Sequence, residues 1–376
     1  MNLKSFSVSF LFWTLCSLPF APGVKAEEPI QVFSYPPEAV SQIPEPGEAG
    51  IHRITGGIYN EAWTFEGYTS SGEIVRTAGG ISEAFPWGNK PFTGASILTP
   101  DSWTEFFHLW LKPDEFRAAS DRLDLSLGTG FFREAGVSAA GFPLYKIQAR
   151  EKGFGLALSV ECLAPAWQPP GEGRLVFGNE KNNYWDISVP CPRARFEGTA
   201  FTSRGEKKIS GFGYIDHTYS NLRILEFVRR ITSYRVHLPE FSLNFLEIET
   251  TPKFGSRPIS LLVLADSQKT RSFSEVKVRQ EQPARDEQYG YSYPKIFKIT
   301  ALDGLDRIEI ILKARRIIIS SDGLANLNRA ERAIVKMLGI KPVGYNFANE
   351  AEVKLTLGGK TQEFKSQSFH SMLILD

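Results

Sequence analysis

The chain has 376 residues, and its 43 lysines and arginines balance 42 aspartates and glutamates, for a formal net charge of +1. This balance argues against nucleic acid as a partner, because binding a phosphate backbone needs a clear excess of basic residues. Beyond the N-terminal segment there is no run of about 18 apolar residues, which argues against membrane-spanning helices. Phe, Tyr and Trp together make up 12% of the chain, and aromatic residues favour strands.

Residues 1–26 have the pattern of a secretory signal peptide. Lys4 gives a basic start, an apolar run extends from Phe6 to Phe20, and Val24-Lys25-Ala26 resembles a cleavage site. A retained anchor and a lipoprotein at Cys16 are the alternatives, but the residues before Cys16 are too large for a lipobox. We therefore expect an exported protein. The lack of a strong disulfide framework favours the periplasm over a eukaryotic secretory lumen.

The rest of the chain is dominated by strand-like segments. Residues 27–50 are rich in Pro, Glu and Gly and are predicted to form an extended linker. After them, short stretches of alternating apolar and polar residues recur between turn residues, and about sixteen strands are predicted in this way. Leu222–Val228 is one of them. With almost no helix between the strands, we predict an all-β fold of antiparallel sheets, with two halves at residues 51–221 and 222–376.

One amphipathic helix is predicted at residues 323–338, in the second half. Asp322 is a suitable cap, and Gly339 ends the pattern. Apolar residues recur on one face and basic residues on the other, among them Arg329, Arg332 and Lys336. The helix either packs its apolar face on the sheet with the basic face in water, or forms a lid or peripheral membrane contact that touches anionic headgroups.

Two cysteines remain after removal of the predicted signal peptide, Cys162 and Cys191. Both lie on the apolar side of strand-like stretches, Cys191 in the series Trp185, Ile187 and Val189. An exported chain would allow a disulfide between them, and two buried free thiols would give the same pattern. The five histidines are scattered, and no Cys or His spacing indicates zinc. We therefore expect no metal site and no cofactor.

The best candidates for chemistry lie in residues 211–221, which read GFGYIDHTYSN. If a strand continues through Asp216 and His217, these side chains point to opposite faces, Asp216 with Tyr214 and His217 with Tyr219. A carboxyl group beside aromatic rings in an apolar cavity keeps its proton to a higher pH, as a general acid requires. The alternatives are a structural role, in which Asp216 caps a turn and His217 joins the two halves, and a role in orienting a ligand.

The same segment resembles the G-x-G-Y-x-D-H signature that closes the first domain of double-barrel, lipocalin-like proteins of the carotenoid 1,2-hydratase type. Asn183-Tyr184-Trp185, Pro192–Gly198, Thr250–Ser256 and Gly344–Ala351 are similar in order and spacing to fungal survival-factor proteins. This resemblance implies two tandem lipocalin-like β-barrels. It also implies the handling of sphingolipids such as ceramide in the survival-factor branch, and addition of water to an isoprenoid double bond in the hydratase branch. The export signal departs from the fungal survival factors, which are intracellular.

A small β-barrel has room for one apolar ligand in a mostly apolar pocket. We predict that aromatic side chains contact this ligand, namely Trp87, Trp185, Tyr214, Tyr219, Phe227 and Tyr234. The alternative is that these rings only fill the hydrophobic cores.

Three functions fit these features. The first is an exported protein that binds or carries a lipid, an isoprenoid or another hydrophobic small molecule. The second is an enzyme of hydratase or cyclase type that acts on an isoprenoid or polyene, with Asp216 as general acid assisted by Tyr214 or His217. The third is a structural protein of the cell envelope. No nucleophile elbow or metal motif is recognisable, which favours the first. The ligand and the oligomeric state stay open.

Overall fold

The computed structural model describes residues 30–31, 49–52, 57–83, 88–101, 103–169, 173–178, 183–238, 240–273, 275–324, 329, 332–333 and 341–375. The predicted signal peptide, Trp87 and most of the predicted helix at 323–338 lie outside the described residues. In the described part of the chain, no helix combines the length and the apolar character that crossing a membrane would need.

The first half forms an antiparallel sheet of 13 strands. They are β1 (Ile30–Gln31), β2 (Asn60–Thr69), β3 (Ile74–Glu83), β4 (Asn89–Leu98), β5 (Thr104–Trp110), β6 (Phe116–Ala118), β7 (Asp124–Leu127), β8 (Gly130–Val137), β9 (Pro143–Glu151), β10 (Phe154–Cys162), β11 (Arg174–Phe177), β12 (Tyr184–Thr202) and β13 (Gly205–Ser220). The order is β5-β4-β3-β2-β13-β12-β10-β9-β8-β7-β6, and β11 joins β1 to β12. A 3₁₀ turn, η1 (Pro113–Glu115), precedes β6.

The second half forms a nine-stranded antiparallel sheet. Its strands are β14 (Val228–His237), β15 (Phe241–Thr250), β16 (Pro258–Asp266), β17 (Thr270–Ser272), β18 (Glu275–Arg285), β19 (Ser292–Asp303), β20 (Asp306–Asp322), β21 (Val343–Leu357) and β22 (Lys360–Ile374). They follow the order β17-β16-β15-β14-β22-β21-β20-β19-β18. A 3₁₀ turn, η2 (Pro252–Phe254), follows β15.

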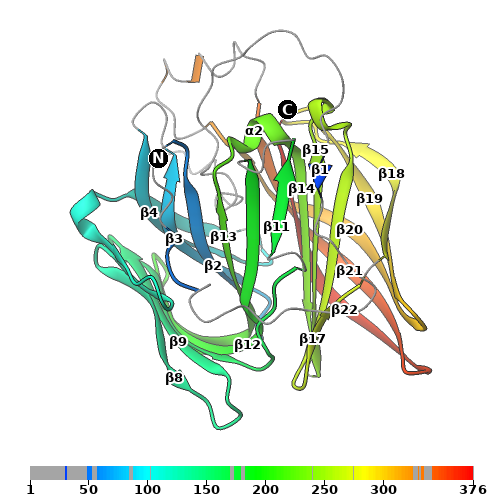
Figure 1. The fold of residues 1–376 in the computed structure, drawn as a ribbon, viewed down its shortest axis with the longest axis horizontal. Helices are drawn as coiled ribbons and strands as arrows, with labels where there is room; N and C mark the ends of the chain where they lie inside the picture. The colour runs from blue at the N-terminus through cyan, green and yellow to red at the C-terminus, as the bar shows by residue number, and fades with distance from the viewer. Residues whose placement is uncertain are drawn as a thin grey trace.

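Each sheet curls on itself into a lipocalin-like barrel, as predicted. Strands β4 and β10, and β16 and β18, are in contact although they are not neighbours in their sheets. The barrels lie side by side (Figure 1), and β12 of the first barrel contacts β15 and β16 of the second. Alternation along the strands gives each barrel an apolar interior. Trp63 and Phe65 are fully buried in the first interior, and Phe297 is 1% exposed in the second.

Strand β12 changes the direction of its side chains near its middle. Its pairing with β13 shifts between Ser188 and Cys191 and again before Ala194, and each such bulge reverses the faces of the strand. Ile187 therefore packs between the barrels, whereas Cys191 packs inside the first barrel. There Cys191 forms a disulfide with Cys162 of β10, with the Cα atoms 5.5 Å apart. The alternation that would place Cys191 on the face of Ile187 thus fails at the bulge.

The connection between the barrels corrects the prediction of a strand at Leu222–Val228. This segment contains a short helix, α2 (Ile224–Phe227), and β14 begins only at Val228. One helical turn redirects the chain from one sheet to the other and buries Ile224 and Phe227 between them. The carbonyl of Phe227 accepts a hydrogen bond of 3.0 Å from the main chain of Thr251, which ties the turn to the second barrel. The predicted division after residue 221 falls in this connection.

Candidate functional site

A cavity of about 150 Å³ lies between the two barrels. Strands β2, β12 and β13 of the first barrel and β14, β15 and β16 of the second contribute its walls. One wall is apolar and includes Trp167, Trp185, Ile187, Val189, Leu261 and Val263. Every second side chain of β2 and β13 points into the first barrel. The side chains between them point outward and can therefore face this cavity. Most of the cavity wall thus comes from the outer faces of the barrels, while Glu61 and Phe245 border it from the interior side of their strands.

Four of the charged residues that line the cavity are linked by ion pairs, namely Glu66, Arg76, Asp216 and Arg235, here called the charged wall. Arg235 of the second barrel reaches across to the first, where one guanidinium nitrogen lies 2.7 Å from Glu66 Oε1 and another 3.5 Å from Asp216 Oδ2. Arg76 Nε lies 2.5 Å from Glu66 Oε2. Arg76 also donates to Ser371 Oγ, at 2.9 Å, so the ion pairs join the two barrels from both sides.

The two carboxyl groups of the charged wall have opposite pKa shifts. Burial raises the pKa of Asp216 to about 6, and the nearby Glu66 adds to this rise while Arg235 opposes it. Burial would also raise the pKa of Glu66, but Arg235, Arg76 and a hydrogen bond from Tyr68 hold it at about 2. Glu66 is therefore a fixed anion, whereas Asp216 exchanges its proton within reach of physiological pH.

Three polar atoms of the cavity wall lack a hydrogen-bond partner among the residues that the structure describes. They are Asn244 Oδ1, Arg235 Nε and Trp167 Nε1, and all three are buried. The amide nitrogen of Asn244 is already used, since it donates to the carbonyl of Pro192 at 2.9 Å. A buried acceptor and a buried donor without partners are unusual, because each loses the free energy of its hydrogen bonds to water. All three atoms are therefore available to a bound molecule.

The structure brings only some of the predicted site residues together. Asp216, Tyr214 and Trp185 line the cavity. Because β13 is continuous from Gly205 to Ser220, the next residue, His217, points to the opposite face and is fully buried. The remaining predicted aromatics do not line the cavity: Tyr219 stacks on His52 beside His217, Phe227 packs in the cluster between the barrels, and Tyr234 is buried inside the second barrel.

The charged wall is the part of the site that the sequence did not reveal. Glu66 and Arg235 are 169 positions apart, so no local spacing links them. A signal existed in retrospect: Arg76 follows the apolar pair Ile74-Val75 in a stretch of β3 that is buried from Ile74 to Gly80. A charged residue within a buried strand requires a partner of opposite charge.

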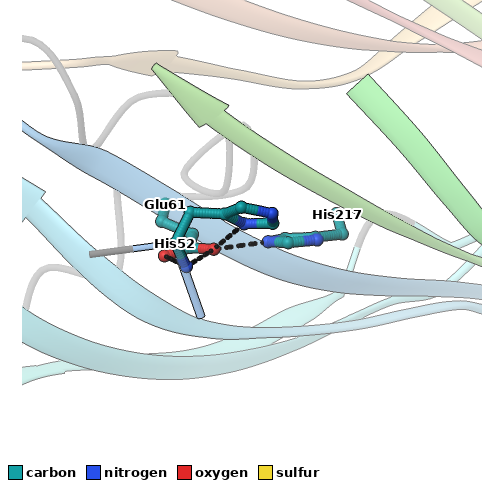
Figure 2. Close-up of side chains that lie close together, drawn as sticks. All are labelled: His52, Glu61 and His217. Atoms are coloured by element: carbon teal, nitrogen blue, oxygen red, sulfur yellow. Dashed lines mark hydrogen bonds and ion pairs between the residues drawn. The ribbon is translucent and has the colours of Figure 1, made fainter. Parts of the chain in front are cut away.

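A second cluster lies on the barrel side of the same strands, at His52, Glu61 and His217. His217 Nε2 is 2.7 Å and His52 Nδ1 is 3.0 Å from the same carboxylate oxygen, Glu61 Oε1. Figure 2 shows both imidazole rings directed at this carboxylate. Stacking fixes the rings, with His217 4.3 Å from Trp63 and His52 3.9 Å from Tyr219 between ring centroids. No local spacing indicates this cluster, because Glu61 and His217 are 156 positions apart.

Known structures with the same architecture share little sequence with this chain. The protein assigned as AttH from Nitrosomonas europaea has a TM-score of 0.60 and 14% identity, over 88% of this chain and 97% of its own. CghA in complex with Sch210972 also has a TM-score of 0.60, at 10% identity, over 89% of this chain and 96% of its own. At these identities the similarity concerns the fold, which is the double barrel.

Sequence similarity points to one branch of these proteins. The ceramide-binding protein SVF1 of Yarrowia lipolytica is 24% identical over 220 residues, which are 52% of this chain and 54% of that protein. The match thus spans about half the length of this curated relative. The match to the Svf1 family is longer and covers residues 102–373. The resemblance to double-barrel proteins is therefore confirmed, and the chain belongs to the Svf1 family.

Proposed function

We propose that this protein binds a lipid or a similar hydrophobic molecule in the cavity between its barrels. The observation that carries the proposal is the cavity itself, where an apolar wall faces buried polar atoms that lack partners. Sites for small molecules have this composition, mostly apolar with a few polar groups that fix the orientation. A lipid has the matching division into an apolar chain and a polar head.

The polar atoms favour a head group that both donates and accepts hydrogen bonds. Asn244 Oδ1 needs a donor and Arg235 Nε needs an acceptor. An amide or hydroxyl head group supplies both, and ceramide has these groups. That the relative from Yarrowia lipolytica is a ceramide-binding protein supports this choice. We therefore propose a ceramide-like lipid as the first ligand to test.

The size of the cavity limits how much of such a lipid it encloses. Its volume of about 150 Å³ is below the roughly 300 to 1,000 Å³ of pockets that enclose a drug-sized ligand. The cavity fits a head group and the adjoining part of a chain, with Trp185 and Val263 against the first methylene groups. We expect the rest of the chain to extend out between the barrels.

A catalytic role is the second candidate, and one observation favours it. Asp216 lines the cavity and its pKa is raised to about 6, which suits a group that gives a proton to an isoprenoid or polyene double bond. In this reaction Asp216 would protonate one carbon of the double bond, water would add to the other, and the proton released by that water would return to the carboxylate. Replacing Asp216 by Asn would abolish such turnover and leave lipid binding in place.

Export to the periplasm remains part of the proposal, supported by the pattern of residues 1–26 and consistent with the disulfide between Cys162 and Cys191. Fractionation of the natural host tests it. Recovery of a chain that starts near residue 27 in the periplasmic fraction is expected, and an intact N-terminus in the cytosol would contradict it.

The binding proposal is tested by blocking the cavity. Ala62 of β2 lines the cavity, and Ala62→Phe places a ring in its open space. Ala135 of β8 is exposed on the first barrel away from the cavity, so Ala135→Phe is the matched control. Full-length proteins are purified, extracted with organic solvent and measured by mass spectrometry, and are also titrated with a fluorescent ceramide.

We expect the wild type and Ala135→Phe to carry lipid and to bind the ceramide equally. Ala62→Phe should bind at least tenfold more weakly while its circular dichroism stays unchanged. Equal binding by Ala62→Phe would place the ligand elsewhere. Failure of the wild type to bind any lipid would favour the structural role in the cell envelope.

A further inference from the structure

Three groups that bind transition metals meet at one edge of the first barrel. His52 comes from the segment before β2, Glu61 from β2 and His217 from β13. Nδ1 of His52, Nε2 of His217 and a carboxylate oxygen of Glu61 all lie within 4.8 Å of one another. Trp63 and Tyr219 stack on the two rings and hold their planes (Figure 2 shows the three ligand groups). Glu66 and Asp216 of the charged wall lie on the other face of β2 and β13.

The spacing of these atoms is close to that of a metal site. Zinc binds histidine nitrogen and carboxylate oxygen at about 2.0 to 2.2 Å, so tetrahedral ligand atoms lie roughly 3.3 Å apart. In the protein, Glu61 Oε1 is 2.7 Å from His217 Nε2 and 3.0 Å from His52 Nδ1. Small rotations of the side chains would open these contacts to the spacing around an ion.

Burial and access also suit an ion with an open coordination position. The side chains of Glu61 and His217 are fully buried, whereas that of His52 is 24% exposed. A metal would therefore enter past His52. Two histidines and one carboxylate are three ligands, which leaves a fourth position for water or another small ligand on that side.

We propose that His52, Glu61 and His217 bind a divalent first-row transition metal, with zinc as the first ion to test. Imidazole nitrogen is a preferred ligand of zinc, and the buried carboxylate neutralises part of the charge of the ion. The site is distinct from the charged wall, because the side chains of Glu61 and His217 point to the barrel side of β2 and β13, although Glu61 also borders the cavity between the barrels. The sequence led us to expect no metal site, and the folded chain supplies one from residues that no spacing connects.

The test uses the full-length protein without a histidine tag, first treated with a chelator. Zinc binding is measured by calorimetric titration, and cobalt is added as a second probe because tetrahedral cobalt absorbs visible light. The variants are His52→Ala, which changes the most exposed ligand, and Glu61→Gln. His108→Gln is the matched control, since His108 lies in β5 of the same barrel and outside the cluster.

We expect one zinc ion per wild-type chain, and the same in His108→Gln. Both ligand variants should bind at least about 100-fold more weakly, since losing a ligand exceeds the 10- to 100-fold effect of an outer-shell change. Zinc should raise the midpoint of thermal unfolding for the wild type and the control, but not for His52→Ala. If Glu61→Gln does not fold, His52→Ala decides alone. Equal zinc binding by His52→Ala, or no saturable binding by the wild type, would overturn the proposal.

Discussion

The interiors of the barrels and the interface between them are built from the same strands but have opposite chemistry. On β2, Trp63 and Phe65 fill the first barrel with apolar contacts, while Thr64 and Glu66, between and beside them, face the second barrel. In a single barrel the outer set would lie in water. Here the second barrel covers it, and polar side chains of an outer surface become buried charges beside a cavity. Association of the two barrels thus creates a cavity that neither barrel has alone.

The interface and the barrel interiors should differ most in how a substitution changes the free energy of unfolding at different pH values, and replacing Arg235 tests this. Arg235→Met leaves Glu66 and Asp216 without their shared cation, and breaking a buried ion pair costs about 3 to 5 kcal/mol. Arg235 lowers the pKa of both carboxyl groups, so its loss raises both values. The loss of unfolding free energy should therefore be smaller at pH 5 than at pH 7, because the carboxyl groups then take up protons.

A core substitution provides the control for this pH dependence. Phe132→Ala in the first barrel removes a fully buried ring at a similar cost of about 3 to 5 kcal/mol. Denaturant unfolding should give the same loss at both pH values for Phe132→Ala, since no titrating group is removed. A loss independent of pH for Arg235→Met as well would show that the charged wall does not titrate as described.

The next largest effect on the free energy of unfolding should come from the disulfide in the first barrel. The disulfide between Cys162 and Cys191 closes a loop with a separation of 29 residues, and a cross-link of this length contributes roughly 3 to 4 kcal/mol through the unfolded state. Replacing both cysteines by alanine should lower the unfolding free energy by this amount. A reducing agent should lower that of the wild type equally and leave that of the double variant unchanged. A wild type insensitive to reduction would show that the thiols are not joined.

The third prediction separates the two acids of the charged wall. The pKa of Asp216 is about 6 in the folded protein against an ordinary 3.8, so between these pH values only the folded state keeps the proton. Stability from this residue therefore falls as pH rises from 4 to 6, by up to about 3 kcal/mol. Asp216→Asn should become more stable relative to the wild type over this range. Glu66→Gln should become less stable relative to it as pH rises from 2 to 4.5, because the pKa of Glu66 is lowered.

The pH dependence of the unfolding free energy must be measured as the difference between each variant and the wild type. Burial lowers the pKa of His108, His237 and His370 to about 3, so all three reduce the stability as pH falls below 6.5. That fall dominates the raw profile and cancels in the difference. Identical profiles for Asp216→Asn and the wild type would argue against a raised pKa at Asp216, and with it against the catalytic candidate.

The local sequence pattern predicted those features of the fold that depend on alternation along a single strand. The all-β fold of antiparallel sheets follows from repeated short strands, whereas the double barrel was implied by the family resemblance. The opposite directions of Asp216 and His217 follow from their adjacency in a continuous β13. The bulges in β12 were not predictable, because one inserted residue reverses the faces of the strand without changing its composition, and Cys191 is separated from Ile187 for this reason. The short helix α2 was not predicted, because its four residues, three apolar and one charged, fit a strand as well as a helical turn.

The residues that line the cavity between the barrels were also predicted only in part, but for a different reason. Trp185, Tyr214 and Asp216 were chosen as inward residues of a barrel, yet they line the cavity because it lies outside both barrels. Which face of a strand meets a ligand depends on the packing of the second barrel. Contacts such as Glu66 with Arg235 arise only from that packing, and a single sequence does not specify it.

The smallest effect should come from an ion pair on the outside of the second barrel. Lys298 Nζ lies 2.8 Å from Glu281 Oε1, about as close as Arg235 lies to Glu66, but both side chains are at least 40% exposed. Water and salt screen such a pair, so Glu281→Gln should change the unfolding free energy by less than about 1 kcal/mol, and by nothing measurable at 1 M salt. Equal losses for Glu281→Gln and Arg235→Met would mean that distance, not burial, determines the strength of these pairs, and the distinction between interface and outer surface would then have no energetic basis.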